Sequence, residues 1–128
     1  MRRIKTEEQI IKEIFLISEE IRYAALYAGE ELFSQQKEDF PDASSSESDR
    51  YEELFVNPTV LKITNQRGNL DCGGTDFVLI KYGKFFQLIR EINNGHISVC
   101  IAPTGDPIKV NTALHTLLID RQLIDDKK

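Results

Sequence analysis

Three short apolar segments between Asp76 and Ala102 constrain the fold more than any other part of the sequence. Asp76 to Tyr82 and Phe85 to Ile92 are rich in β-branched and aromatic residues, and only the dipeptide Gly83-Lys84 separates them. A glycine in the first position suits a type II′ hairpin turn. The chain then returns through Asn94-Gly95, a strong hairpin signal, into residues 96–102. The sequence therefore predicts a three-stranded antiparallel meander whose apolar face must pack against other elements.

Length and charge limit the classes of protein to which the chain can belong. Its 128 residues predict a single domain over 1–128, and its net charge of −5 argues against a nucleic-acid partner, because binding to phosphates draws on Lys and Arg. No apolar run approaches the ~18 residues of a membrane span. We therefore expect a cytoplasmic protein without a membrane span. Cys72 and Cys100 have no short-spaced partner, so we expect reduced thiols.

The first thirty-six residues predict a helix followed by a segment with two interpretations. A capping box at Thr6 and isoleucines at helical spacing predict a helix from about Thr6 to Glu20. Residues 22–35 contain good helix formers that could continue this helix. Alternating side chains around Gly29-Glu30 instead predict a hairpin, which we favour because an unbroken helix through Gly29 would be long for a domain of this size.

A second helix is predicted from Ser48 to Arg67, after an acidic, Ser-rich surface loop over 37–49. Asn57-Pro58 interrupts its pattern, so we expect two short helices or one sharp kink, with Gly68 as the left-handed residue that ends it. The loop carboxylates, taken as a solubilising surface rather than a metal site or a docking surface for a basic partner, are Glu38, Asp39, Asp42, Glu47 and Asp49.

The last helix is predicted to begin with Asp106 as its cap and Pro107 at its first position, and residues 125–128 are expected to fray. The diglycine Gly73-Gly74 superficially resembles a phosphate-binding loop. No Lys-Ser/Thr pair follows it, so we interpret it as a turn.

Few residues are candidates for chemistry. His96 and Cys100 are four apart on one predicted strand and so share a face, and with Cys72 or His115 they could complete a zinc site or an activated thiolate. Their spacing matches no known ligand pattern, so we favour Cys100 as a small core residue and His96 as a residue beside its turn. The sequence contains none of the common catalytic motifs. We therefore expect no catalytic residues, no metal and no cofactor, and a binding protein rather than an enzyme.

In the order helix, hairpin, helix, meander, helix, the sequence resembles the roadblock family of dynein light chains and their bacterial relatives. The likeness is strongest over Leu70 to Pro107, where Asp76-Phe-Val-Leu-Ile-Lys-Tyr-Gly-Lys-Phe-Phe-Gln-Leu-Ile resembles the family's central strand pair. It implies an α+β fold with a five-stranded antiparallel sheet in the order 2-1-5-4-3. The first and last helices would lie on one face and the second helix on the other. Asn57-Pro58 and the long 37–49 loop depart from the family pattern.

The resemblance also implies a homodimer, in which the strand from Asp76 to Tyr82 pairs with its copy and the second helices pack alongside one another. A single helix cannot cover one face of a five-stranded sheet, so we expect an exposed apolar patch that includes Phe55 and Leu61. The expected interface comprises Tyr51, Leu54, Phe55, Val60, Leu61, Thr64, Phe77, Leu79 and Lys81.

Members of the family serve as adaptors, and several regulate small Ras-like GTPases without a conventional active site. The resemblance therefore implies a non-enzymatic dimeric adaptor or regulator whose partner is a small GTPase. The alternative is a profilin-like or PAS-like module that senses a small molecule, which predicts a monomer with an interior pocket. An enzyme is the third interpretation, and it would need a metal bound at Cys100 and His96.

Overall fold

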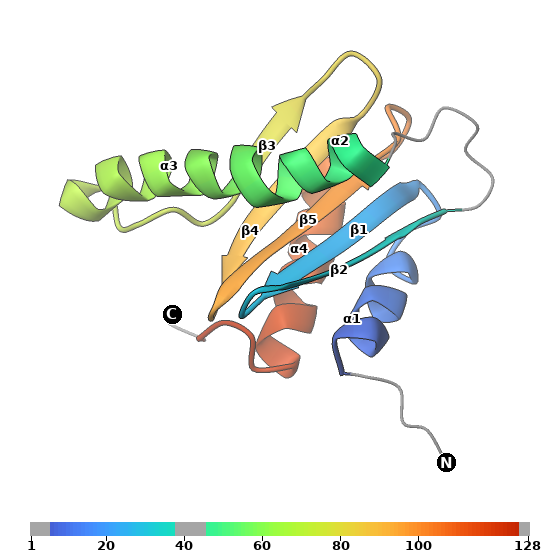
Figure 1. The fold of residues 1–128 in the computed structure, drawn as a ribbon, viewed down its shortest axis with the longest axis horizontal. Coiled ribbons are helices and arrows are strands. Elements are labelled where there is room, and N and C mark those ends of the chain that lie inside the picture. Colours follow the sequence, from blue (N-terminus) through green and yellow to red (C-terminus); the bar gives the residue numbers. More distant parts are fainter. Residues whose placement is uncertain (1–5, 38–45, 126–128) are drawn as a thin grey trace.

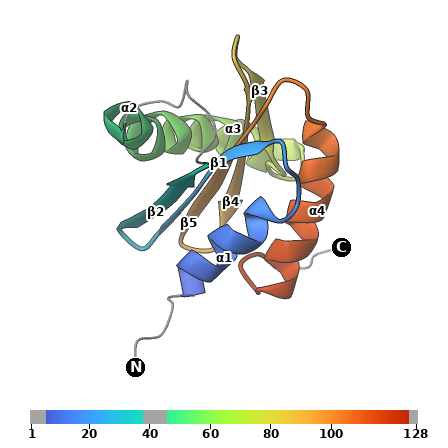
Figure 2. The same cartoon turned by 90° about the vertical axis from the view of Figure 1, so that its right-hand side faces the viewer.

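The computed structural model describes residues 6–37 and 46–125 of the chain. Five strands form a single antiparallel sheet in the order β2-β1-β5-β4-β3, which is the predicted order. Helices α1 and α4 cover one face of this sheet, and a long helix formed by α2 and α3 crosses the other face (Figures 1 and 2). The elements are α1 (Thr6–Phe15), β1 (Ile21–Ala28), β2 (Glu31–Gln36), α2 (Ser46–Tyr51), a π-helical turn η1 (Glu52–Val56), α3 (Asn57–Asp71), β3 (Val78–Lys81), β4 (Phe86–Ile92), β5 (Gly95–Ile101) and α4 (Pro107–Asp120).

The segment with two interpretations is a hairpin. Strands β1 and β2 pair in register up to Ala28 and Glu31, and Gly29 at the turn has a φ of +63°. Helix α1 ends at Phe15 rather than at Glu20, and Leu16, which follows it, is 84% exposed. The predicted helix was therefore too long, because the isoleucine spacing continues past its end into residues that lead to β1.

The two faces of the sheet differ in chemistry. On the side of α1 and α4, the strands present mostly aliphatic side chains to an apolar core, joined by Phe33 and Phe86, and Arg90 is a buried charge on the same side. Burial of each large aliphatic side chain there contributes roughly 1.5–3 kcal/mol before entropic costs. The opposite face, under the long helix, carries polar side chains. The fully buried aliphatic residues of the apolar core include Ile10, Ile14, Leu26, Leu88, Ile97, Val99, Ile101, Leu114 and Leu118.

The long helix passes through Pro58 without the break that the sequence predicted. Directly before the proline, the turn η1 is π-helical, and the backbone amide of Asn57 donates to the backbone carbonyl of Glu52, five residues back. In an α-helix the proline ring would clash with the carbonyl four residues back. The wider turn changes the hydrogen-bonding register before that clash occurs, so α2, η1 and α3 follow one another without a gap from Ser46 to Asp71.

Gly68 does not end this helix, as the sequence had predicted, but packs inside it. A Cβ at Gly68 would lie 3.1 Å from the backbone of Gly74, and the carbonyl of Gly68 accepts hydrogen bonds from the amides of Cys72 and Gly74. The positive φ angles occur instead at Gly73 (+83°) and Gly74 (+86°). The diglycine therefore forms the turn that folds the chain back against the helix end.

Both hairpin turns of the meander differ from their predictions, the first in its type and the second in the residues that form it. Gly83-Lys84 lies at the tip of the first turn, where the Tyr82 amide donates to the Phe85 carbonyl, but Gly83 lacks the positive φ of a type II′ turn. In the second turn Ile92 pairs with Gly95, so Asn93 and Asn94 form the loop, and Asn94 has a φ of +72°. Gly95 belongs to β5 instead.

The start of α4 agrees with its prediction. Asp106 caps this helix, accepting from the amides of Ile108 (3.1 Å) and Lys109 (3.2 Å). Most of the predicted acidic loop falls on residues 38–45, which lie outside the described residues, and residues 46–49 form the start of α2. Among the helices of the described ranges, none combines the length and apolar character needed to cross a membrane.

Gly95 is required by the close approach of β1 and β5, so Gly95→Ala should destabilise the protein. A Cβ at this position would lie 1.7 Å from the carbonyl oxygen of Tyr27. We expect urea unfolding to show a loss of roughly 1–3 kcal/mol, the usual cost of overpacking. The matched control is Gly83→Ala, where an added Cβ meets nothing within 4 Å and φ is not positive. Equal stability of the two variants would contradict a steric requirement for glycine at position 95.

Candidate functional site

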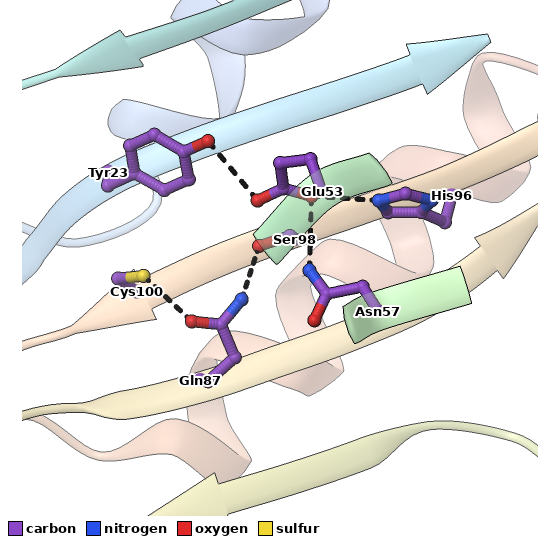
Figure 3. A network of polar contacts seen from close by, with 7 residues as sticks. All are labelled: Tyr23, Glu53, Asn57, Gln87, His96, Ser98 and Cys100. Carbon is purple, nitrogen blue, oxygen red and sulfur yellow. Dashed lines mark hydrogen bonds and ion pairs between the residues drawn. The ribbon is translucent and has the colours of Figure 1, made fainter. Parts of the chain in front are cut away.

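A buried carboxylate joins the long helix to the polar face of the sheet. Glu53 lies in the π-helical turn and is 0% exposed. The Tyr23 hydroxyl donates to Oε2 of Glu53 (3.2 Å), and the side-chain amide of Asn57 donates to Oε1 of Glu53 (3.1 Å). The same Oε1 lies 2.8 Å from Nε2 of His96. Figure 3 shows the three side chains converging on Glu53 from β1, α3 and β5.

This arrangement accounts for how a carboxylate can be buried here. A buried polar group is costly unless it is hydrogen-bonded, and a buried charge is costlier still. Glu53 meets three partners on three different elements, so its position fixes the helix relative to the sheet. The Oδ1 atom of Asn57 is buried and has no hydrogen-bond partner among the described residues.

A second polar chain continues along the same face of the sheet. The Gln87 amide nitrogen donates to the Ser98 hydroxyl (2.6 Å), and the Cys100 thiol donates to the Gln87 amide oxygen (3.1 Å; Figure 3). Burial, and secondarily the charges of Glu53, Asp49 and Glu52, raise the pKa of Cys100 well above its usual range. A thiol with a raised pKa forms little thiolate at neutral pH, which makes Cys100 a poor nucleophile.

The pKa of Tyr23 is shifted in the same direction. Burial raises it most, and the neighbouring charge of Glu53 adds to the shift. Tyr23 therefore remains a hydroxyl that donates to the carboxylate, and its role is to hold Glu53 in place.

The residues considered for chemistry do not converge on one centre. His96 and Cys100 share a face, as their spacing predicted, but His96 contacts Glu53 whereas Cys100 contacts Gln87. His115 lies on the opposite side of the sheet, 3.0 Å from the guanidinium of Arg90, and Cys72 is exposed. Within residues 6–37 and 46–125, no group of three His, Cys, Asp or Glu side chains is arranged to hold a metal ion.

Sequence reasoning missed the central residue of this site. Glu53 stands in the acidic run after the 37–49 loop, and its charge indicated a solvated position. The one available signal was Asn57-Pro58, since a proline inside a helical pattern requires an irregular turn just before it. His96 was interpreted as a strand-start residue beside its turn, and it does lie at the start of β5, but its burial (2% exposed) and its contact with Glu53 were not foreseen. Cys100 was interpreted as a small core residue, but it lies on the polar face and is partly exposed.

Two hollows lie between the long helix and the sheet. The first, of about 370 Å³, is bounded by the start of the helix, the sheet and the β3–β4 turn. Its walls include Tyr23, Glu52, Glu53, Tyr82, Phe85 and Cys100. The second, of about 470 Å³, includes Tyr27, Leu61, Asn65, Glu91 and His96 in its walls. Glu53 and His96 thus form a bonded pair that links the walls of the two hollows.

A separate buried charge lies on the α4 side of the sheet. Arg90 is 3% exposed and donates to Asn111 (2.8 Å) and to Asp76 (2.8 Å). Burial lowers its pKa, and the charge of Asp76 opposes this effect. Because Asp76 precedes β3 and Asn111 lies on α4, Arg90 ties the edge of the sheet to the last helix.

Known structures with the same architecture place this geometry among related folds. MglB in a tetrameric arrangement is 12% identical, aligns over 87% of this chain and 81% of its own, and has a TM-score of 0.69. The gliding protein MglB from Thermus thermophilus is 11% identical over 87% of this chain and 82% of its own (TM-score 0.65). MglC from Myxococcus xanthus is 11% identical over 91% of this chain and 96% of its own (TM-score 0.59).

These similarities concern the fold, because the identities are low. The chain has a roadblock-like fold. No family model matches the sequence, and no curated protein matches it. The roadblock-like architecture was therefore recognisable from the order of elements and from structure, but not from residue identity.

The residues predicted for a dimer interface of this roadblock-like fold occupy three environments. Tyr51 (62%) and Phe55 (61%) are exposed on the long helix, and Lys81 is exposed on β3. Five others are partly buried, namely Leu54, Val60, Thr64, Phe77 and Leu79. Leu61 is only 5% exposed, so its expected place in an exposed patch was wrong. Its side chain faces inward and forms part of the wall of the second hollow, between the helix and the sheet.

The two cysteines of this roadblock-like chain should differ sharply in reactivity. Cys72 is exposed, whereas the thiol of Cys100 has a raised pKa and donates a hydrogen bond to the Gln87 amide oxygen. At pH 8 we expect Ellman's reagent to modify Cys72 rapidly and Cys100 slowly, with Cys72→Ser as the control that isolates Cys100. In urea both thiols should react at similar rates. Fast reaction of Cys100 in the folded Cys72→Ser variant would contradict the burial and bonding described here.

Proposed function

We propose that the protein is a non-enzymatic homodimeric adaptor or regulator that binds a small Ras-like GTPase. The roadblock-like fold supports this proposal, because the family that the sequence resembles includes such regulators. Two further observations on this chain favour self-association, and each concerns a surface that a single chain leaves open.

The first observation carries the proposal. The outer face of the long helix presents an aromatic pair to solvent, with the rings of Tyr51 and Phe55 5.5 Å apart and both more than 60% exposed. Ile63 (60%) and Leu70 (77%) extend the exposed apolar surface along α3. Large exposed apolar side chains gathered along one helix favour an interaction surface there.

The second observation is a strand edge beside this helix. Among the strands of the described residues, β3 pairs only with β4 and forms one end of the sheet (Figure 1). An uncovered edge offers unpaired backbone groups that pair readily with a second strand. Val78 and Ile80 stand opposite Ile89 and Gln87 of β4, which places them on the face under the long helix. A second copy that pairs at β3 would thus bring its long helix alongside the first.

Charge at the aromatic pair should dissociate the dimer. We expect light scattering to give the wild-type protein twice the 14.7 kDa of one chain and Phe55→Glu the mass of one chain. An unpaired charge in a dry interface costs several kcal/mol. The control is Leu16→Glu, a similar change at a side chain that is 84% exposed after α1, which should remain dimeric. Because both side chains are exposed, both variants should fold. A Phe55→Glu protein that remains a dimer would reject this interface.

The GTPase partner can be tested independently of the interface. We expect the wild-type protein to bind a Ras-like GTPase from the same organism, with different affinities for the GDP-loaded and GTP-loaded forms, in a calorimetric titration. Leu16→Glu should bind equally well. If no Ras-like GTPase binds in either nucleotide state, and none shows a changed rate of GTP hydrolysis, then the GTPase part of the proposal is wrong.

A further inference from the structure

The first hollow, beside Glu53, has the size and the walls of a ligand site. Its volume of about 370 Å³ lies at the small end of the range for small-molecule pockets, ~300–1,000 Å³. It opens between the start of the long helix and the turn that joins β3 to β4. Its inner wall includes Tyr23, Glu53 and Cys100, side chains that the polar contacts of the site already hold in place.

One wall of this hollow is aromatic. Tyr82 and Phe85 flank the β3–β4 turn with their rings 5.4 Å apart, and Tyr23 closes the inner end. The Phe85 ring already accepts a cation, because the Arg22 guanidinium lies 5.7 Å from its centre and is further anchored by donating to the Lys84 carbonyl (3.1 Å). Aromatic faces attract ammonium and guanidinium groups through the ring quadrupole.

The opposite wall is acidic, and one of its oxygens has no partner. Asp49, Glu52 and Glu53 line the hollow from the helix. Glu53 is occupied by its three partners, and Asp49 accepts from Gln36 (2.8 Å). The Oε2 atom of Glu52 is shielded from solvent and has no hydrogen-bond partner among the described residues. Within this wall, Glu52 is the carboxylate that a bound group can still neutralise.

The electrostatics of Glu52 agree with this geometry. Burial raises its pKa most, and the charges of Glu53 and Asp49 raise it further. Burial and the charge of Glu52 raise the pKa of Tyr82 across the hollow. A bound cation would relieve this accumulation of negative charge, whereas an anion would increase it and a neutral ligand would leave it unchanged. Lys84 also lines the hollow, but it belongs to the exposed turn.

We propose that this hollow binds a small organic cation, an ammonium or guanidinium compound with a short apolar stem. Its charged group pairs with the carboxylate of Glu52, and its stem lies along the rings of Tyr82 and Phe85. The proposal does not rest on dimerisation or on a GTPase partner, because every residue that it uses belongs to one chain. Its failure would therefore leave the proposed function unaffected.

The test uses matched probes and the isotope-labelled full chain. We expect pentylammonium and agmatine to shift amide resonances of residues 48–53 and 82–85 in a saturable way. Pentanol and pentanoate, which have a similar stem but no positive charge, should shift them far less. If neither cation shifts these resonances, or if pentanol shifts them equally, cation recognition is overturned. Binding of a partner protein's arginine without binding of either free probe would also overturn the proposal.

Two variants place the probe in the hollow. Glu52→Gln keeps the shape of the side chain but removes its charge, and should weaken pentylammonium binding about tenfold or more. Tyr82→Leu, at a side chain that is 38% exposed, should weaken it about threefold by removing an aromatic face. The control is Glu91→Gln, at a carboxylate that bonds Asn65 beside the other hollow and should not matter. Equal affinities for wild type and Glu52→Gln would show general attraction to an acidic surface and would overturn the proposal.

Discussion

The buried carboxylate of Glu53 is the contact on which the arrangement of the molecule depends. The aliphatic face of the sheet excludes water wherever α1 and α4 cover it, and such packing tolerates small shifts between its layers. The other face has no such uniform packing, and the helix there is positioned by directional bonds to Tyr23, Asn57 and His96. Directional bonds of this kind specify one arrangement more narrowly than aliphatic contact does. The sheet thus joins a layer held by apolar burial to a layer held by polar contacts.

This division places the open surfaces of the molecule on one side. Because the polar face accepts only one crossing helix, the outer side of that helix stays uncovered, with Tyr51 and Phe55 exposed. The two hollows between the long helix and the sheet have the same origin. The sheet is twisted, so a single straight helix that crosses it cannot stay in contact with it along its whole length. On the other face, two helices and an ion pair between Glu13 and Arg121 close the layer. The proposed dimer contact and the proposed cation site both lie on the side of the single helix.

Much of the fold was predictable from local patterns, because hairpins, caps and turns depend on neighbouring residues. Asp106 and Pro107 indicated where α4 begins, and the alternation around Gly29 indicated a hairpin. The failures involve tertiary context. Whether Gly68 ends a helix or packs against Gly74 depends on where the following turn lies, and whether Gly95 serves a turn or a strand depends on the approach of Tyr27. The site was largely hidden for the same reason, since the burial of Glu53 requires donors 30 and 43 residues away in the sequence.

The π-helical turn has a consequence for how relatives of this chain can be recognised. It holds one more residue than an α-helical turn, so a protein without the proline at position 58 could present the same inner and outer faces with one residue fewer. An alignment of two such proteins would need a gap inside a continuous helix, where gaps are ordinarily penalised most. Comparison by residue position alone would then shift the second half of the helix out of register with its counterpart. A comparison of structures would still detect such a relationship where an alignment of sequences no longer does.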